Sequence, residues 1–414
     1  MSASAPLPRP ATLEEFDRAL SGLLSEVGAS AAQRERDRVL LHDDVAALQA
    51  LGFGALRLPV AHGGLGVSFE QLVRRLVRIA AADSNLAHVY RGHIAFVEDL
   101  LARDAGDAHT ITWFERIAAG DLVGNAQSER QETAEIATTL HRDGERLLLT
   151  GRKYYTTGSI YADWIVLSAL DDGERVLVSV SAHDPGVTSV DDWDGFGQPL
   201  TGSGTTTFDA VPVDPAEIVV PGGDLAVDGH RAAVFQLVLL AVVAGIGQAA
   251  LRDTLAFVVP RRRIFGSPGE TRPRDDAVTQ GVVGSVSSAV DAATRLVLSG
   301  AADVERAVAR RRGGEEDALR DVLVDVFRLQ QVVSPLVLSA ATELFEVGGA
   351  SAVSRGVALD RHWRNVRTIH SHNPAAQRRR AIGEFELNGT LPRWEPAGAA
   401  RSAHDTAVRE ESPA

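Results

Sequence analysis

Apolar residues recur at two different spacings along the chain, and the spacing changes twice. Over 12–120 they follow helical periodicity, as at Leu72 and Leu76. Over 121–223 the pattern shifts to short alternating runs that are separated by Asp-Gly and Pro-Gly pairs, which is typical of strands joined by turns. Helical periodicity then returns in long segments. The pattern predicts an N-terminal helical domain, a central β domain and, over 224–394, a C-terminal helical bundle.

One stretch of the last segment is unusually apolar. Ala232 to Leu251 contains no charged residue and is long enough to cross a bilayer as a helix. It also carries Gln236 and Gln248, and amphipathic helical patterns lie on both sides. We therefore expect a central helix that is buried on all faces of the bundle, with a membrane span as the alternative.

Composition narrows the range of functions. The 414 residues suffice for two or three packed units, and a net charge of −13 disfavours a nucleic-acid-binding protein, which would need a basic surface. The chain has no cysteine, which excludes disulfides, a thiolate nucleophile and thiolate metal sites. The first residues lack the apolar core of a signal peptide, so a cytoplasmic location is expected. Residues 1–11 are expected to be a disordered lead-in and 395–414 a mobile tail.

The order of a helical, a β and a second helical part, together with four motifs, gives the chain a family resemblance. The motifs are the run 144–170 with Leu149-Thr150-Gly151-Arg152-Lys153-Tyr154-Tyr155-Thr156-Thr157-Gly158 and then Ala162-Asp163; Trp193 to Val213; Phe208-Asp209-Ala210-Val211-Pro212-Val213; and Arg262-Arg263-Ile264-Phe265-Gly266. From about Phe53 to Pro392 the sequence resembles the acyl-CoA dehydrogenase superfamily. The resemblance implies an α+β fold: the acyl-CoA dehydrogenase fold, with an N-terminal helical domain, a central β domain and a C-terminal four-helix bundle.

Within the superfamily, the chain is most similar to the flavin-dependent monooxygenases typified by dibenzothiophene monooxygenase and the sulfur-acquisition oxidoreductases. The residues that carry this similarity are Asp83 to His88 with His93, Gly124 to Glu129, Asp192-Trp193-Asp194 with Gln198, Leu344 to Ala350, and the tail from Asp360 to Gly389. Dehydrogenases of the superfamily usually show TEPxxGSD where this chain has Asn125-Ala126-Gln127-Ser128-Glu129.

The base that a dehydrogenase needs is missing from its expected places. Acyl-CoA dehydrogenation requires a carboxylate that removes an α-proton above the flavin. The segment His230 to Gly266 has no glutamate and only one acid, Asp253, and the tail carries Ile369-His370-Ser371-His372 where a base would be sought. Simple dehydrogenation is therefore disfavoured.

The resemblance implies a set of catalytic residues. His372 is the first candidate, His93 the second and His370 the third, because an imidazole gives or takes a proton near neutral pH. His370 is out of register with the first tail histidine of the relatives, so it either replaces that residue or lies on the surface. Asn125 and Thr157 are expected to hold the flavin ring and its oxygen adduct by neutral hydrogen bonds. His88, about a turn and a half from His93, is expected to face away and to be structural, and no metal site is expected.

The resemblance also implies the cofactor site. The expected flavin-binding residues are Asn125, Ser128, Tyr155, Thr157, Trp193, Arg262 and Phe265. Arg262 matches an arginine that binds the flavin phosphate, commonly across a subunit boundary. Trp193 has a plain alternative as an aromatic residue of the β-domain core, and the helix dipole alone explains part of the cluster Arg261 to Arg263.

These residues together predict a two-component monooxygenase. It would take reduced FMN from a separate NAD(P)H:flavin reductase, form a C4a-(hydro)peroxyflavin with O2 and oxidise a small organic molecule, with organosulfur compounds favoured. The cofactor FAD is possible. The alternatives are an FAD-dependent acyl-CoA dehydrogenase, an N- or C-hydroxylase on the same fold, and a catalytically silent scaffold. A homotetramer with neither a nucleic-acid nor a membrane partner is implied.

Overall fold

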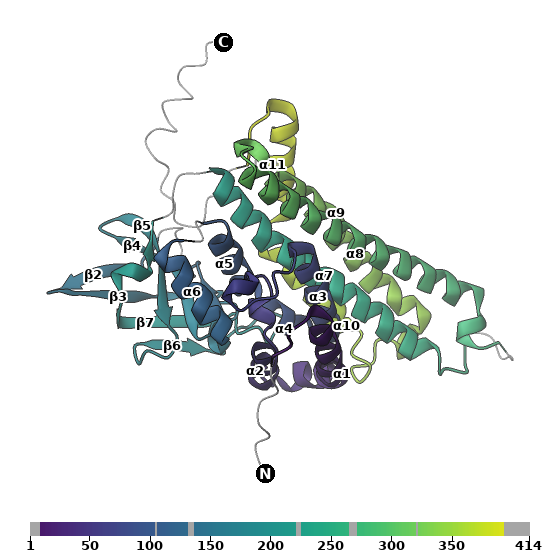
Figure 1. The fold of residues 1–414 in the computed structure, drawn as a ribbon. Helices are drawn as coiled ribbons and strands as arrows, with labels where there is room; N and C mark the ends of the chain where they lie inside the picture. Colours follow the sequence, from purple (N-terminus) through teal and green to yellow (C-terminus); the bar gives the residue numbers. More distant parts are fainter. Residues whose placement is uncertain are drawn as a thin grey trace.

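The computed structural model describes residues 9–103, 106–130, 136–220, 225–264, 271–319 and 322–392. Figure 1 shows a sheet at one end, long helices at the other and the N-terminal helices between them. The tail at 395–414, most of the lead-in at 1–11 and Phe265 lie outside the described residues.

The N-terminal part is helical up to Ala119, as the apolar periodicity predicts. A capping box formed by Thr12 and Glu15 starts the first helix, and Ser68 with Gln71 starts the third in the same way. Leu72, Leu76 and Ile79 are buried along one face of that third helix. The helices are α1 (Leu13–Asp37), α2 (His42–Leu51), α3 (Phe69–Ala82), α4 (Ser84–Val89), α5 (Arg91–Leu101) and α6 (Ala108–Ala119), with short 3-10 turns at Phe53–Ala55 and Val60–His62.

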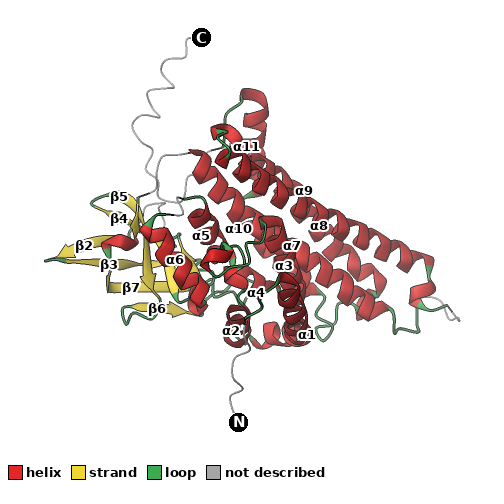
Figure 2. Ribbon diagram, in the orientation of Figure 1, coloured by secondary structure: helices red, strands yellow, loops and turns green. Residues whose placement is uncertain are grey.

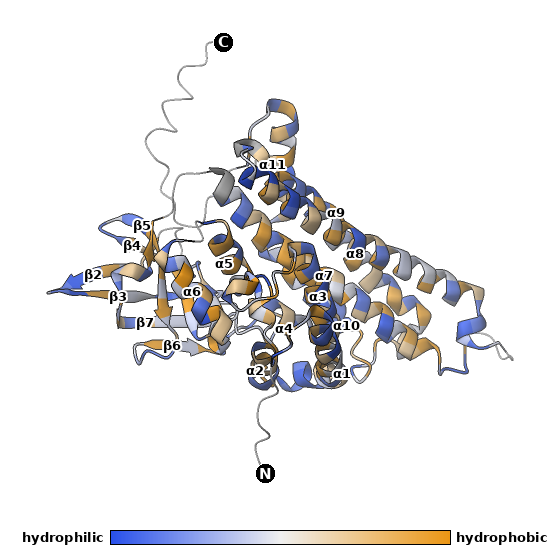
Figure 3. Cartoon of the chain, in the orientation of Figure 1, coloured by the Kyte–Doolittle hydropathy of each residue, from blue (hydrophilic) through white to orange (hydrophobic). Residues whose placement is uncertain are grey.

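The central part is an eight-stranded mixed sheet. Its strands are β1 (Val123–Ala126), β2 (Thr139–Asp143), β3 (Arg146–Lys153), β4 (Trp164–Asp171), β5 (Glu174–Ser181), β6 (Val187–Val190), β7 (Thr205–Pro212) and β8 (Ile218–Val219). Their order is β6-β7-β3-β2-β4-β5-β8, and β1 pairs in parallel with β4. Figure 2 shows helices against one end of the sheet, while the tip of β2 and β3 projects away and is polar in Figure 3.

The C-terminal part is a helical bundle. Three long helices, α7 (Leu225–Val258), α8 (Ala277–Arg312) and α9 (Val322–Glu343), pack on one another, and α10 (Asp360–His372) and α11 (Ala375–Asn388) pack on α9. Further 3-10 turns lie at Ser159–Tyr161, Pro215–Glu217, Pro273–Asp275, Glu316–Leu319, Leu344–Val347 and Gly349–Ser351. The order of helices, sheet and helical bundle agrees with the α+β architecture predicted from the sequence.

Helix α7 is the central helix of the molecule. Its residues from Ala232 to Ala244 are almost all buried, in a core shared with α3 and α9. Gly245 allows the close approach to α3, since a Cβ there would lie 2.4 Å from the Cβ of Ala80 and 2.6 Å from the backbone oxygen of Val77. The uncharged run is thus the buried helix that the flanking patterns favour.

Length and composition alone would let three described helical stretches span a bilayer. They are Asp228–Val258, Ala277–Arg312 and Val322–Val347, and the buried shares of their most apolar windows are 83%, 22% and 50%. The central stretch is therefore covered by protein, whereas α8 leaves most of its apolar window uncovered in a single chain.

Candidate flavin and substrate site

The candidate site lies where α4, α5, the sheet and α10 meet. Gly92 of α5 touches β1, because a Cβ at Gly92 would lie 2.6 Å from the Cβ of Asn125. Gly158, which has a positive φ of 84°, touches α4, because its Cβ would lie 2.6 Å from the backbone oxygen of Val89. These two close approaches bring Asn125 and Thr157 beside the helices that carry the buried histidines.

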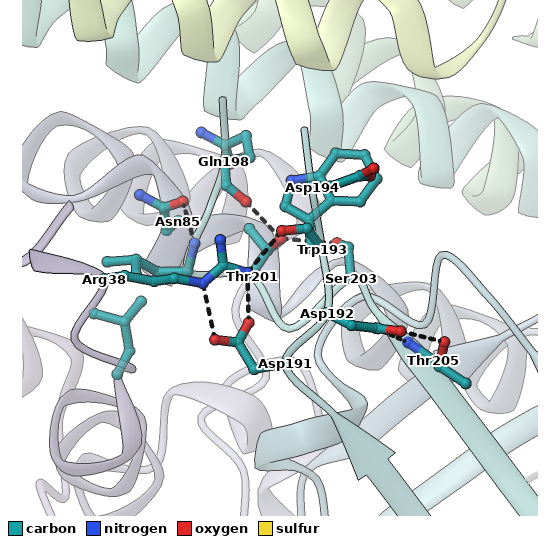
Figure 4. A network of polar contacts seen from close by, with 12 residues as sticks. Arg38, Asn85, Asp191, Asp192, Trp193, Asp194, Gln198, Thr201, Ser203 and Thr205 are labelled. Carbon is teal, nitrogen blue, oxygen red and sulfur yellow. Dashed lines mark hydrogen bonds and ion pairs between the residues drawn. The ribbon is translucent and has the colours of Figure 1, made fainter. Parts of the chain in front are cut away.

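The segment 191–205 is held by polar contacts from several sides (Figure 4). Arg38, at the end of α1, binds both carboxylate oxygens of Asp191 at 2.9 Å and donates to the backbone oxygen of Trp193 at 2.7 Å. Asp192 accepts from the backbone and the hydroxyl of Thr205, each at 2.7 Å. The loop that carries Trp193 is therefore fixed to both the helical and the β parts.

Aromatic rings stand together beside this loop. Tyr155 has a φ of 64°, which is rare for a bulky residue, and its side chain is 45% exposed. Its ring lies 4.8 Å from Tyr154 and 6.1 Å from Trp193, while the Trp193 nitrogen donates to the backbone oxygen of Gly197. A strained and exposed tyrosine next to a tryptophan gives a flat ligand an aromatic surface.

Hydroxyl groups connect Thr157 to this loop. Thr157 and Ser203 are 2.8 Å apart, Ser203 and Thr201 are 2.7 Å apart, and Thr201 donates to the backbone oxygen of Gln198. Gln198, Thr201 and Ser203 all belong to the network of polar contacts in Figure 4. Thr157 thus belongs to a buried chain of neutral hydroxyl groups that ends at Gln198.

Gln198 determines which nitrogen of His88 carries the proton. The Gln198 amide nitrogen donates to Ser84 at 2.8 Å, so its oxygen faces His88 Nδ1 at 3.0 Å. His88 Nδ1 must then be the protonated nitrogen, and Nε2 keeps a free lone pair. This Nε2 is sealed from water and has no protein partner. A buried acceptor without a donor fits a ligand that brings an N–H or O–H group.

Arg91 is a buried cation near His88. Its side chain is stacked over the ring of Phe235 at 4.6 Å and donates to the backbone oxygen of Phe235 at 3.3 Å. Within the described ranges, no carboxylate lies within ion-pair distance of it. Burial lowers the pKa of Arg91 to about 9, which leaves it charged at neutral pH.

His372, at the end of α10, completes this group. The residue is exposed in the single chain. Desolvation, followed by the charges of Arg91 and His88, holds its pKa well below the usual value. For His88, burial and then the Arg91 charge lower the pKa to about 3. Both imidazoles are therefore neutral at pH 7.

The other predicted histidines differ from this pair. His93 accepts at Nδ1 from the backbone of Val123 at 3.2 Å, and its Nε2 binds the backbone oxygen of Gly54 at 3.0 Å. Both ring nitrogens of His93 are thus hydrogen-bonded to the protein backbone, and neither is available to bind a ligand. His370 is half-buried, its Nδ1 has no partner, and burial and the charges of Arg367 and Arg379 lower its pKa. The charges near His370 are those of Arg367 and Arg379, whereas His372 lies near Arg91 and His88.

The remaining predicted flavin-binding residues are Ser128, Arg262 and Phe265. Ser128 lies beside the aromatic rings, and its backbone oxygen accepts from Tyr154 at 3.0 Å. Arg262 is exposed beyond the far end of α7, about 35 Å along the helix from Phe235 at 1.5 Å per residue. Phe265 lies outside the described residues. The chain alone does not bring Arg262 to the other candidates.

A hollow of about 730 Å³, including its open mouth, adjoins this group of residues. It is lined by Gly92, Ala95, Phe96 and Asp99 of α5, by Gly124, Asn125 and Gln127, by Val166, Arg175 and Leu177 of β4 and β5, and by Asp228, Arg231 and Phe235 of α7. Phe235, whose ring is covered by the Arg91 guanidinium, connects the hollow to Arg91.

Asp253, the one acid between His230 and Gly266, is held by a hydrogen bond and an ion pair. Asp253 accepts from Arg361 at 2.7 Å and contacts His362 Nε2 at 3.0 Å. Burial alone would raise the pKa of Asp253, but the His362 bond and the Arg361 charge outweigh burial and lower it. The acids of the hollow, Asp99 and Asp228, both contact Arg231. None of these carboxylates is free to act as the base of a dehydrogenase.

Known proteins resemble this chain in sequence and in fold. Residues 237–377 match the C-terminal domain of acyl-CoA dehydrogenases. The chain is 25% identical over 352 residues to a probable FMNH2-dependent monooxygenase, SfnC, of Pseudomonas putida (84% of this chain, 88% of the relative). It is 26% identical over 390 residues to dibenzothiophene monooxygenase of Rhodococcus qingshengii (90% and 93%). The FMN-bound structure of TdsC from Paenibacillus sp. A11-2 superposes with a TM-score of 0.84 at 24% identity, covering 93% of this chain and 99% of that one.

Proposed function

We propose that this chain, which belongs to the acyl-CoA dehydrogenase superfamily, is a reduced-flavin-dependent monooxygenase that oxidises small organosulfur compounds. The observation that carries the proposal is the group His88, Arg91 and His372: two neutral imidazoles beside a buried cation, with no free carboxylate beside them among the residues that the structure describes. The names of the relatives support FMN as the cofactor.

The residues present fit a flavin. Tyr155 and Trp193 offer aromatic surface, Asn125 and Thr157 offer neutral polar groups, and His88 Nε2 is a buried acceptor that lacks a donor. When bound, reduced FMN supplies the two electrons with which one atom of O2 becomes water while the other atom joins the substrate.

The protein's own groups would control charge and protons around that reaction. Arg91 stabilises negative charge on oxygen, because a buried cation acts strongly in a poorly solvated site. His88 accepts a hydrogen bond at Nε2 and thereby orients the group that donates it. His372, neutral and beside the Arg91 charge, takes up a proton and returns it readily because its protonated form is disfavoured. The burial of His88 and Arg91 limits access of bulk water to those two residues.

Further features belong to the same proposal. The enzyme works in the cytoplasm as the oxygenase of a two-component system, with O2 and a small molecule as substrates and an NAD(P)H:flavin reductase as its source of FMNH2. It is a homotetramer without a membrane or nucleic-acid partner, in which Arg262 reaches the flavin phosphate of another subunit. The exposed position of Arg262 and the uncovered apolar window of α8 support this assembly.

Turnover assays test the proposal directly. With FMN, a flavin reductase, NADH and air, the purified protein should convert methyl phenyl sulfide to its sulfoxide. With FAD, an acyl-CoA and an artificial electron acceptor it should give no enoyl-CoA. Product in the second assay and none in the first, across a panel of sulfides, sulfones and sulfinates, would overturn the proposal in favour of a dehydrogenase.

A further inference from the structure

The walls of the hollow beside Asn125 are largely apolar and rigid. Phe96 packs edge-on against Trp113 at 4.6 Å, and Phe235 is held by Arg91 over its ring. Val166 and Leu177 add aliphatic surface from the sheet. Such walls favour an apolar body of a ligand over a strongly hydrated one.

Four charged residues also line this hollow, and three of them, Arg231, Asp99 and Asp228, form one cluster of ion pairs. Arg231 binds Asp99 at 2.5 Å and Asp228 at 3.4 Å, so both acids share one cation. Arg175, which enters from β5, is the fourth. Its Nε is sealed from water without a hydrogen-bond partner, and in the part of the chain that the structure describes no carboxylate lies within 4 Å of its guanidinium.

An arginine in this position destabilises the folded chain unless a nearby negative charge offsets its own charge. Desolvation lowers the pKa of Arg175, the Arg231 charge lowers it further, and Asp228 only partly opposes them. The Arg175 side chain is partly buried and its Nε is wholly buried, so an anion bound in the same hollow would offset the cost of that partial desolvation. A guanidinium is also well shaped to bind two oxygens of one group.

We propose that Arg175 is the anion-binding residue of the substrate pocket, and that the substrate is a small molecule with an apolar body and an anionic head such as a sulfinate, sulfonate or carboxylate. The apolar body lies between Phe96 and Phe235, and the head contacts the Arg175 guanidinium. This inference rests on the proposed function, because it names the class of molecule that the proposed enzyme would oxidise.

Binding of two matched probes tests this inference without any turnover. Benzenesulfonate and methyl phenyl sulfone share a phenyl ring and two sulfonyl oxygens, and they differ in an anionic oxygen against a methyl group. By calorimetry on the full-length protein, benzenesulfonate should bind at least about tenfold more tightly, as loss of a charge-assisted bond implies. Arg175→Gln should remove that preference.

A second charge-neutralising variant controls for the change in net charge. Arg146→Gln removes an exposed arginine from β3 and should keep the preference for benzenesulfonate. Equal affinity for both probes in the unmodified protein, or a preference that survives Arg175→Gln, would overturn the inference. Because neither probe needs flavin or oxygen, failure here is distinct from failure of the monooxygenase assay.

Discussion

Among single residues, the group His88, Arg91 and His372 depends most on Arg91. Its charge is the second cause, after burial, of the low pKa of both His88 and His372. A fixed cation beside two imidazoles keeps both of them unprotonated, so the arginine remains the charged donor of the site.

Replacing that cation should shift both titrations. In Arg91→Gln we expect the pKa values of His88 and His372 to rise, because the Coulomb repulsion is lost while the burial remains. Histidine-selective NMR titration of the two rings measures this. Arg295→Gln, an exposed change on α8, is the control and should leave both titrations as they are. Unchanged pKa values in Arg91→Gln would show that Arg91 does not set the charge of the site.

The histidines also show where residue-level prediction from sequence stops. Counting residues along one helix makes His88 and His93 face different sides, but the helix breaks at Tyr90, where α4 ends and α5 begins. Both histidines are consequently buried, and their partners distinguish them: Gln198 for His88 and two backbone groups for His93. Those partners come from distant parts of the chain, so no local pattern reveals them.

At the scale of elements, α7 is positioned by its contact with α3. Gly245 lies where α7 meets the backbone of Val77 and Ala81, so the two helices are closer than any side chain would allow. The same helix carries Arg231 and Phe235 into the hollow and Gln236 toward Asn373. Its spacing from α3 therefore affects the site as well as the core.

A methyl group at this contact should destabilise the protein. Gly245→Ala should lower the free energy of unfolding by about 1–3 kcal/mol, because backbone atoms must move apart. Urea denaturation measures the change. Gly229→Ala on the same helix is the matched control: its nearest neighbour would lie 3.9 Å away, so stability should stay or rise by up to about 1 kcal/mol. Equal effects of the two variants would contradict the packing argument.

Helices and strands could be predicted from the sequence because each has its own spacing of apolar residues. The alternating runs became the sheet, and the uncharged run became a buried helix instead of a membrane span. The position of Arg262 relative to the site could not be predicted in the same way, because α7 carries it about 35 Å from the rest of the site within one chain. A second subunit, which a single sequence does not display, is needed to bring it there under the proposed assembly.

For the whole molecule, buried neutral histidines make stability depend on pH. Burial lowers the pKa of His93, His230 and His362 to about 4 each, against 6.5 in an unfolded chain. Between those values the unfolded state binds more protons, so stability falls as the pH falls from about 6.5 toward 4. Glu35 and Asp99, whose pKa values burial raises, act in the opposite direction at the acidic end.

One of these histidines can be isolated by substitution. His93→Gln should reduce the loss of unfolding free energy between pH 7 and pH 5 by about 2 kcal/mol, as expected for one imidazole whose pKa drops by about 2.5. Urea denaturation at both pH values provides the comparison. His141→Gln, on the exposed strand β2, controls for the loss of an imidazole. An undiminished pH dependence in His93→Gln would contradict the account of His93.

The central claim, that this fold uses reduced flavin to insert oxygen, is tested most directly by isotope labelling. The purified protein would be supplied with FMNH2 by a flavin reductase under 18O2, with methyl phenyl sulfide and benzenesulfinate as substrates, and the products analysed by mass spectrometry. The account predicts one 18O atom in each molecule of oxidised product, and no product without FMNH2. Products that carry oxygen from water, or flavin oxidation without any oxygenated product from either substrate, would contradict it.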